Sequence, residues 1–284
     1  MSGGREDVRA TFWLLEAPDS LAQESRGNPD GTGLGYYDEQ GQPVVLKQPL
    51  AAYEDQQFAQ EAREISSNIF IAHVRHASGS PVTLRNTHPF VQDGRLFAHN
   101  GVIGDLPALE RELGTAMSMV GGETDSERYF ALVTREIERT GDVGEGILSA
   151  ARWIAERLPV FAINCVLITE SDLWALRYPD VHELHLLERV PGGSSGRRHL
   201  ELASARGSVR VRSADLTRRP AVIVASEVMD EHPEWRALRS GELVHVDADL
   251  KVTVTHAIDR PPAHQLTLAD LDPKAAASQA HATA

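Results

Sequence analysis

The sequence contains a single cysteine and no long apolar run, and each absence excludes a class of protein. Cys165 alone cannot form an intrachain disulfide or a cysteine-rich metal site, which agrees with a reducing compartment. No uninterrupted apolar stretch approaches the roughly 20 residues of a membrane-spanning helix. The polar residues 1–7 do not fit a secretory signal. We therefore expect a cytoplasmic protein.

Positive charge is also scarce. The chain has 28 Lys and Arg against 41 Asp and Glu, which gives a formal net charge of -13 at pH 7. A surface that binds nucleic acid or an anionic membrane needs clustered Lys and Arg, and here the basic residues are scattered. We expect neither partner. The 42% hydrophobic and 24% charged content is that of an ordinary globular protein with a sizeable core.

Strand-like segments lie at both ends of the chain and helical segments lie between them. Helices are expected over 12–16, 54–64, 106–113, 124–139 and 146–158, and the fourth opens with a capping pattern of Thr124 and Glu127. This order favours a layered domain in which helices cover sheets. The Ala-rich residues 272–284 have no apolar period and are expected to be disordered. The expected strands are 34–37, 43–47, 68–75, 95–99, 160–169, 173–178, 185–188, 221–226, 243–247 and 252–256.

Two apolar strands end in residues that could bind an amino acid. Arg75 lies in an apolar strand, where it either pairs with an internal acid or awaits an anionic ligand. His99-Asn100-Gly101 closes the next strand. There an Asn amide beside an unhindered backbone N–H could form an oxyanion hole, although an Asn-Gly turn is a common structural feature.

A helix start supplies a possible third contact. Asp125 lies in the first turn of the expected 124–139 helix, where the helix dipole favours an acid for structural reasons alone. It could instead bind an ammonium group. Together, Arg75 and Asp125 could hold the carboxylate and amine of an α-amino acid, while Asn100 and Gly101 bracket a carbonyl farther along it.

Metal and serine chemistry have less support. Four histidines, His73, His76, His88 and His99, could suggest a metal site. No Glu lies at metal-ligand spacing and no His-Glu-x-x-His motif occurs, so no metal or other cofactor is expected. The Gly-x-Ser-x-Gly pattern of serine hydrolases occurs only at residues 192–196, in a Gly- and Ser-rich, loop-like stretch and not between a strand and a helix, so serine chemistry is not expected either.

The motifs together resemble the glutaminase domain of class II glutamine amidotransferases, especially small stand-alone bacterial members. The resemblance extends to about residue 259 and implies an α+β fold with four αββα layers, that of the N-terminal nucleophile hydrolases. Residues 260–284 would form a largely disordered tail. The motifs that carry the resemblance are, in order, Asp30 to Gly35, His73 to Ser78, Asn86 to Phe90, His99 to Gly101, Thr124 to Glu127 and Ala225 to Glu227.

The resemblance also implies roles. Arg75 would bind the α-carboxylate of glutamine or of a γ-glutamyl compound, with help from Ser78, and Asp125 would bind its α-amine. Asn100 and Gly101 would form the oxyanion hole. An enzyme that accepts the ammonia is a possible partner.

The family's nucleophile is an N-terminal cysteine whose own α-amine is the general base, but here Ser2 follows Met1. Ser2 opens a polar, Gly-rich stretch, unlike the family's apolar strand. Cys165 lies in an apolar strand, where a thiol should be protonated and inert. We therefore predict that this chain is inactive as a glutaminase.

Two explanations fit the missing cysteine. Either a Met-Cys strand precedes the given start, which the intact pocket residues favour, or the protein only binds a γ-glutamyl ligand or a partner. A metal-dependent hydrolase built on the histidines is a third, weaker hypothesis.

Overall fold

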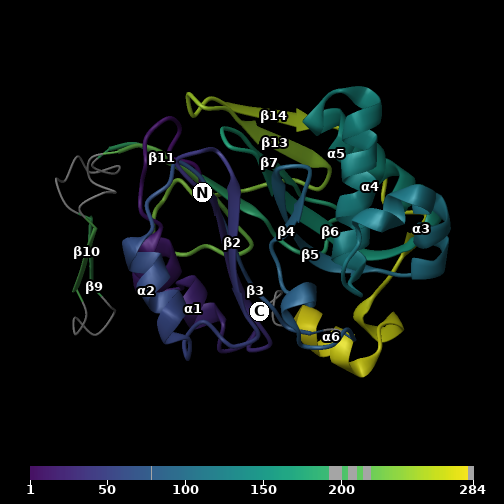
Figure 1. Cartoon of the computed structure of the whole chain (residues 1–284), viewed down its shortest axis with the longest axis horizontal. Helices are drawn as coiled ribbons and strands as arrows, with labels where there is room; N and C mark the ends of the chain where they lie inside the picture. Colours follow the sequence, from purple (N-terminus) through teal and green to yellow (C-terminus); the bar gives the residue numbers. More distant parts are fainter. Residues whose placement is uncertain (78, 192–199, 204–209, 214–218, 281–284) are drawn as a thin grey trace.

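A computed structural model describes residues 1–77, 79–191, 200–203, 210–213 and 219–280 (Figure 1). None of the helices in these ranges is long and apolar enough to cross a bilayer. The helices are η1 Phe12–Glu16, α1 Leu21–Glu24, α2 Gln56–Glu64, η2 Leu84–Asn86, α3 Leu106–Leu113, η3 Gly114–Met119, α4 Asp125–Thr140, α5 Val143–Arg157, η4 Leu268–Asp270 and α6 Pro273–Ala280. The strands are β1 Thr32–Tyr37, β2 Pro43–Gln48, β3 Phe70–Val74, β4 Phe90–Gln92, β5 Arg95–Ile103, β6 Pro159–Ile168, β7 Leu173–Leu176, β8 His185–Arg189, β9 Leu200–Ala203, β10 Arg210–Ser213, β11 Ala221–Ala225, β12 Arg236–Ala237, β13 Glu242–Val246, β14 Val252–His256 and β15 His264–Gln265.

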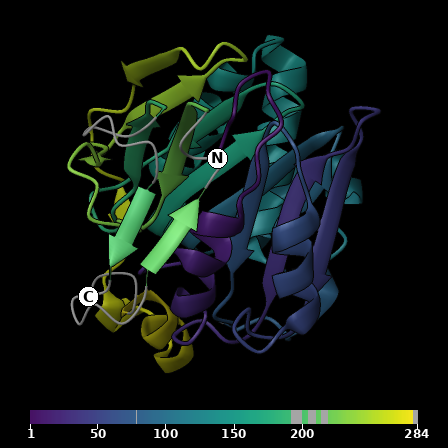
Figure 2. The ribbon, with the colours of Figure 1, turned by 90° about the vertical axis from the view of Figure 1, so that its left-hand side faces the viewer.

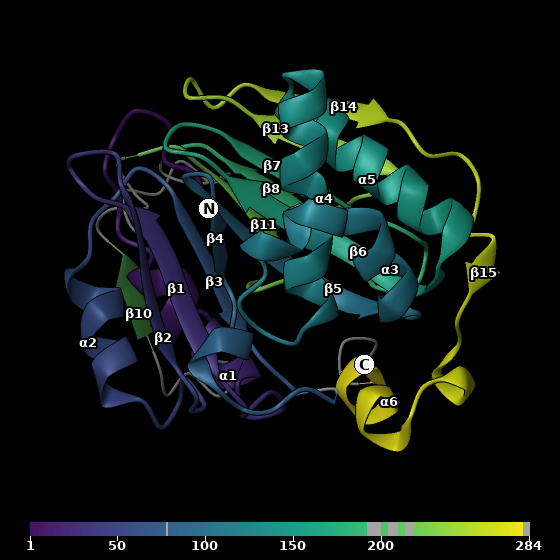
Figure 3. The same cartoon turned by 45° about the vertical axis from the view of Figure 1, so that its right-hand side comes forward.

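The largest sheet has seven strands and one helical face. Its order is β14-β13-β7-β6-β5-β4, antiparallel throughout, and β15 pairs with β6 in parallel. Helices α4 and α5 lie across β5 and β6 (Figure 3). Fully buried Tyr129 and Phe130 of α4 pack there with Ile154 of α5 and Phe97 of β5, so the amphipathic helices form the first layer.

The other face of this sheet packs on two smaller antiparallel sheets. Their orders are β2-β1-β3 and β11-β8-β12. Ile71 of β3 and Leu186 of β8 meet Leu96 and Ala175 of the large sheet in one apolar cluster. This cluster is the core between the two β layers.

A fourth layer of short helices covers the smaller sheets. Leu14 of η1 and Phe58 of α2 pack against Leu34 of β1, while Trp13 packs against Ile223 of β11. The layer order α, β, β, α is therefore confirmed, as is the α+β class.

Most expected elements occur within a few residues of their predicted bounds, but β5 differs. The strand was expected over 95–99 with a turn at Asn100-Gly101, and it instead continues through these two residues to Ile103, paired with β6. The irregularity comes one residue later, as a register shift between Val102 and Ile103. The expected turn at Gly101 was therefore wrong, because pairing with β6 extends the strand.

The end of the chain also differs from expectation. Residues 264–280 form β15, η4 and α6 in place of a disordered tail, and Ala275, Ser278 and Gln279 are buried. The His182 ring donates a hydrogen bond from Nε2 to Gln279 Oε1 (2.7 Å), which anchors α6. The domain boundary near residue 259 stays a prediction.

Gly101 has φ +149, and a Cβ on it would collide with the carbonyl of Ala162 in β6. We predict that Gly101→Ala lowers the free energy of unfolding by about 2–4 kcal/mol, since strain and overpacking each cost about 1–3 kcal/mol. Urea unfolding measures this. Gly94→Ala is the matched control, because Gly94 also has positive φ (+72) but has no atom near its Cβ position. Equal losses in the two variants would refute the collision.

Candidate functional site

The first two residues lie between the two smaller sheets. Ser2 forms antiparallel bridges with both Ile69, next to β3, and Val222 of β11. The α-amine of Met1 donates to Phe70 O (2.8 Å), and Phe70 N–H donates to Met1 O (2.9 Å). Figure 2 shows the N-terminus within the body of the molecule, beside the purple strands β1 and β2. Burial lowers the pKa of the Met1 amine to about 5.

Beyond Met1, the facing edges of β3 and β11 leave an unfilled strand position. Backbone groups alternate sides along an antiparallel strand. Because Phe70 bonds to Met1, the N–H and C=O groups of Ala72 and Val74 point to the same side. Because Val222 bonds to Ser2 (2.8 and 2.9 Å), those of Val224 point toward β3. No strand in the described ranges pairs with these edges. We call the space between residues 70–75 and 222–226 the slot.

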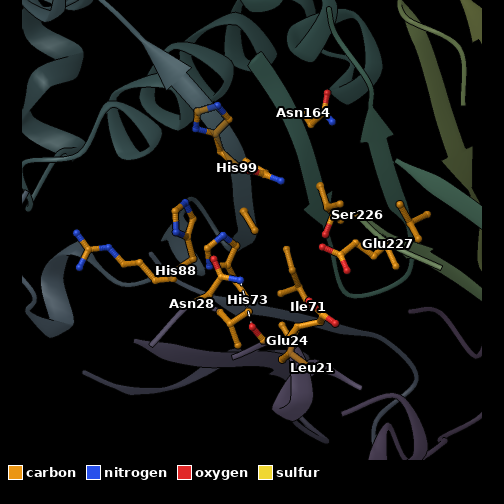
Figure 4. Close-up of a pocket in the computed structure, with 18 of the residues that line it drawn as sticks. Leu21, Glu24, Asn28, Ile71, His73, His88, His99, Asn164, Ser226 and Glu227 are labelled. Carbon is orange, nitrogen blue, oxygen red and sulfur yellow. Dashed lines mark hydrogen bonds between the residues drawn. The ribbon is translucent and has the colours of Figure 1, made fainter. Parts of the chain in front are cut away.

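The slot opens into a cavity of about 270 Å³ that brings the predicted site residues together. Arg75, Asn100, Gly101 and Asp125 all line it, although Arg75 directly follows β3, Asn100 and Gly101 belong to β5 and Asp125 begins α4. Figure 4 shows Ile71 and His73 across the cavity from Ser226 and Glu227. The volume lies near the lower end of small-molecule pockets, which run from about 300 to 1,000 Å³.

Arg75 is almost fully buried, and its guanidinium is tied to the loop that follows β3. Nη2 donates to Ser80 Oγ (2.7 Å) and Ser80 O (3.2 Å), and Nη1 donates to Pro81 O (3.3 Å). Burial lowers the pKa of Arg75, while Asp30 and Asp125 raise it. Arg75 is thus a buried cation with two carboxylates nearby. Ser78, the other predicted carboxylate contact, lies outside the described residues.

Asp125 is the first residue of α4, and the helix start forms as the capping pattern predicts. Thr124 Oγ1 accepts from Glu127 N–H (3.1 Å). Asp125 Oδ1 accepts from Ser126 N–H (2.8 Å), and its Oδ2 accepts from Ile103 N–H (2.9 Å) of β5. The carboxylate is therefore held by two backbone donors at the cavity wall. This explains how strand and helix together orient it.

Ser2 and Cys165 were the two side chains considered as nucleophiles from the sequence, and neither is placed to attack a substrate. Ser2 is fully buried, and its Oγ accepts from Gly4 N–H (3.2 Å). Cys165 lines the cavity but is 2% exposed, and burial raises the pKa of its thiol to about 12. The thiol contacts Tyr129 Oη at 3.6 Å. Cys165 is therefore the protonated core residue that its apolar strand predicts.

The histidines form a buried cluster. The rings of His73 and His88 lie 4.1 Å apart, and His88 also contacts the Phe90 ring edge-on at 4.7 Å. Neither ring nitrogen of His88 has a hydrogen-bond partner in the part of the chain that the structure describes. That part also contains no group of three or more His, Cys, Asp or Glu side chains that could hold a metal ion.

Two parts of the cavity wall were not predicted from sequence. Glu24 and Glu227 lie close together there, and burial, with Glu24 adding to it, raises the pKa of Glu227 to about 7. Ser278 and Gln279 of α6 form another part. Glu227 belongs to a recognised motif, but no local pattern marks Glu24 or Gln279. Their position depends on tertiary packing.

The buried histidines should make the fold sensitive to acid. Burial lowers the pKa of His73 to about 3, and burial lowers that of His88 well below its usual 6.5. Below pH 6.5 the unfolded chain therefore binds more protons than the folded chain. Each such histidine should cost about 1.4 kcal/mol of stability per pH unit below 6.5 and nothing above it.

We predict that His88→Phe, which keeps a ring in the stack, removes one such contribution. Between pH 6.5 and 5.5, urea unfolding should show the variant losing about 1 kcal/mol less stability than the parent. The same variant at pH 7.5 is the control, because neutral histidine contributes no pH dependence there. Identical pH slopes for both proteins would show that burial does not lower the pKa of His88 in the folded state.

Comparison with known proteins adds sequence evidence. A family model described as "Glutamine amidotransferases class-II" matches residues 19–268. An uncharacterized protein of Methanocaldococcus jannaschii is 31% identical over 235 residues, which cover 80% of this chain and 63% of that protein. A protein of Saccharomyces cerevisiae named "Probable glutamine amidotransferase DUG3" is 30% identical over 160 residues, which cover 49% of this chain and 44% of that protein. The matched part of the chain thus spans less than two thirds of the length of each of these two relatives.

A solved structure supports the fold. The glutamine aminotransferase class-II domain protein of Silicibacter pomeroyi superposes with a TM-score of 0.56 at 18% identity, covering 80% of this chain and 92% of that one. At this identity the likeness concerns the fold, which is that of the N-terminal nucleophile hydrolases. With the family match across most of the chain, it follows that the chain belongs to the class II glutamine amidotransferases.

Proposed function

We propose that the full protein hydrolyses glutamine, or a related γ-glutamyl amide, through a cysteinyl thioester. The observation that carries this proposal is the slot, because a strand added there would run directly into the cavity lined by Arg75, Asn100 and Asp125. Edges of this kind are templates for an added strand. In this proposal the nucleophile stands on residues that precede Met1 in the full protein.

The register of the slot locates that nucleophile. Met1 faces Phe70, and each step along β3 toward Arg75 moves one residue upstream in an antiparallel partner. The residue that faces Arg75 therefore stands about five residues before Met1. On the β11 side, the same segment would pass Val224 and Ser226. An N-terminal cysteine at that position would bring its thiol and α-amine to the cavity.

The cavity residues would then have separate roles in binding and in catalysis. Arg75 binds the α-carboxylate, with Ser78 as a further contact, and Asp125 binds the α-ammonium. The cysteine sulfur attacks the γ-carbonyl carbon, and its proton passes to the α-amine, whose ordinary pKa of about 7.7–8.0 suits a base. Asn100 and Gly101 stabilise the oxyanion. The C–N bond breaks, the protonated amine returns the proton to the leaving ammonia, and water hydrolyses the thioester to glutamate.

The acceptor of the ammonia is not specified by these residues. A partner enzyme could receive it, or it could leave to solvent. A protein that only binds a γ-glutamyl ligand is the competing candidate, and the second experiment below separates the two.

We predict that this chain binds glutamine without hydrolysing it, and that Arg75→Gln weakens binding about tenfold to a hundredfold, since a hydrogen bond to a charged group contributes about 1.5–3 kcal/mol. Calorimetry measures the affinity. Arg157→Gln is the matched control, because Arg157 is exposed and outside the cavity. Absence of heat from glutamine with the parent protein would contradict the pocket assignment.

We further predict that a filled slot restores both stability and activity. The extended protein carries five residues before Met1: a Cys followed by four apolar, β-branched residues. An initiator methionine precedes the Cys and is removed, so that the Cys becomes N-terminal. It should melt at a higher temperature than the parent, because the open edges of β3 and β11 become paired, and it should release ammonia from glutamine.

Replacing that cysteine with alanine in the extended protein separates the two effects. This control should keep the higher melting temperature and release no ammonia. A raised melting temperature with no ammonia from the cysteine form would favour the binding protein. Unchanged melting temperatures would show that the slot does not receive these residues.

A further inference from the structure

Behind the cavity wall, four polar groups form a buried chain that ends at Asp125. His99 Nε2 lies 3.2 Å from Ala162 O, and His99 Nδ1 lies 2.9 Å from Ser126 Oγ. Ser126 Oγ is in turn 3.3 Å from Asp125 Oδ1. His99 and Ser126 are 3% and 5% exposed, so water does not compete for these contacts.

The carbonyl at one end determines which atoms donate. A carbonyl oxygen can only accept, so His99 Nε2 must carry a hydrogen. Burial lowers the pKa of His99, although Asp125 and the Ala162 carbonyl oppose this, and a neutral ring carries only one hydrogen. His99 Nδ1 is then an acceptor. The Ser126 hydroxyl has one hydrogen, and it donates this hydrogen to Nδ1 at the shorter of its two contacts.

This direction leaves Asp125 available to a ligand. A carboxylate has about four acceptor positions, and two of them take the N–H groups of Ser126 and Ile103. If Nδ1 were a donor, the Ser126 hydroxyl would turn to Asp125 Oδ1. It would then occupy an acceptor position that an ammonium group could use.

We propose that His99 is a positioning residue: by accepting the Ser126 hydroxyl hydrogen, it keeps Asp125 free to bind the α-ammonium of the substrate. This inference rests on the proposed function. Six other titratable groups in the described ranges are neighbours of His99. His73, His88, Asp125 and His182 interact with it electrostatically, the Tyr129 ring lies against it, and Cys165 is its strand partner in β6. Burial favours the neutral forms of the three histidines, of the Tyr129 hydroxyl and of the Cys165 thiol.

The test uses two ligands and two substitutions in this chain. Selectivity for the α-amine is the ratio of the Kd of glutaramate, which is glutamine without its α-amino group, to the Kd of L-glutamine. His99→Gln can keep a donor toward Ala162 O but loses the acceptor at Nδ1, so the Ser126 hydroxyl turns to Asp125. We expect this ratio to fall about fivefold to tenfold, the effect of one competing hydrogen bond.

Removing the hydroxyl should undo this loss. The double variant His99→Gln/Ser126→Ala should recover most of the ratio, and Ser126→Ala completes the double-mutant cycle. A purely structural role for His99 would leave the double variant no better than His99→Gln. That result, or an unchanged ratio in His99→Gln, would overturn the proposal.

A second measurement needs no variant. Nitrogen NMR of the imidazole in the unaltered protein at pH 7 should show His99 Nε2 protonated and Nδ1 unprotonated. The opposite tautomer, or a doubly protonated ring, would overturn the proposal even if neither ligand binds. Failure of both ligands to bind, with the expected tautomer present, would instead count against the proposed function.

Discussion

Backbone hydrogen bonding at the edges of β3 and β11 is the constraint on which the rest of this structure depends. Buried N–H and C=O groups are costly when unpaired, so a sheet that opens into the interior needs a strand, a ligand or water along its edge. The first three residues meet this need at one level, because Met1 and Gly3 hydrogen-bond to residues 70 and 68 on one side and Ser2 hydrogen-bonds to Val222 on the other. Beyond it, the same edges border the cavity, so the strand geometry that builds the sheet also aligns the proposed site.

The electrostatics of the cavity follow from its burial. The polar groups around Arg75 and Asp125 include two imidazoles and a thiol whose pKa values are moved toward their neutral forms by burial. Beside these neutral groups lie the guanidinium of Arg75 and the carboxylate of Asp125, with Asp30 as a second carboxylate near Arg75. An amino acid zwitterion, with a carboxylate and an ammonium group on one carbon, matches such a pair.

Local patterns predicted much of this arrangement. The apolar strands and the Thr124 cap were readable because their cause lies within a few residues, and the cap positions Asp125 as expected. Ordered motifs indicated the αββα fold. The run through Asn100 and Gly101 was misread as a turn, because pairing with β6 outweighs the usual preference of Asn-Gly. Glu24 and Gln279 reach the cavity only through packing of distant segments, which no periodicity records. The slot likewise arises where residues 70–75 and 222–226, about 150 positions apart, come together.

The burial of Cys165 has a consequence for chemical labelling of this protein. Its thiol is 2% exposed with a pKa near 12, so it offers almost no thiolate to an alkylating reagent at neutral pH. The sequence contains no other cysteine. The folded chain should therefore give almost no signal of its own in thiol labelling. A reactive probe on it would report a single thiol introduced anywhere else, including one carried into the slot, without interference from the native residue.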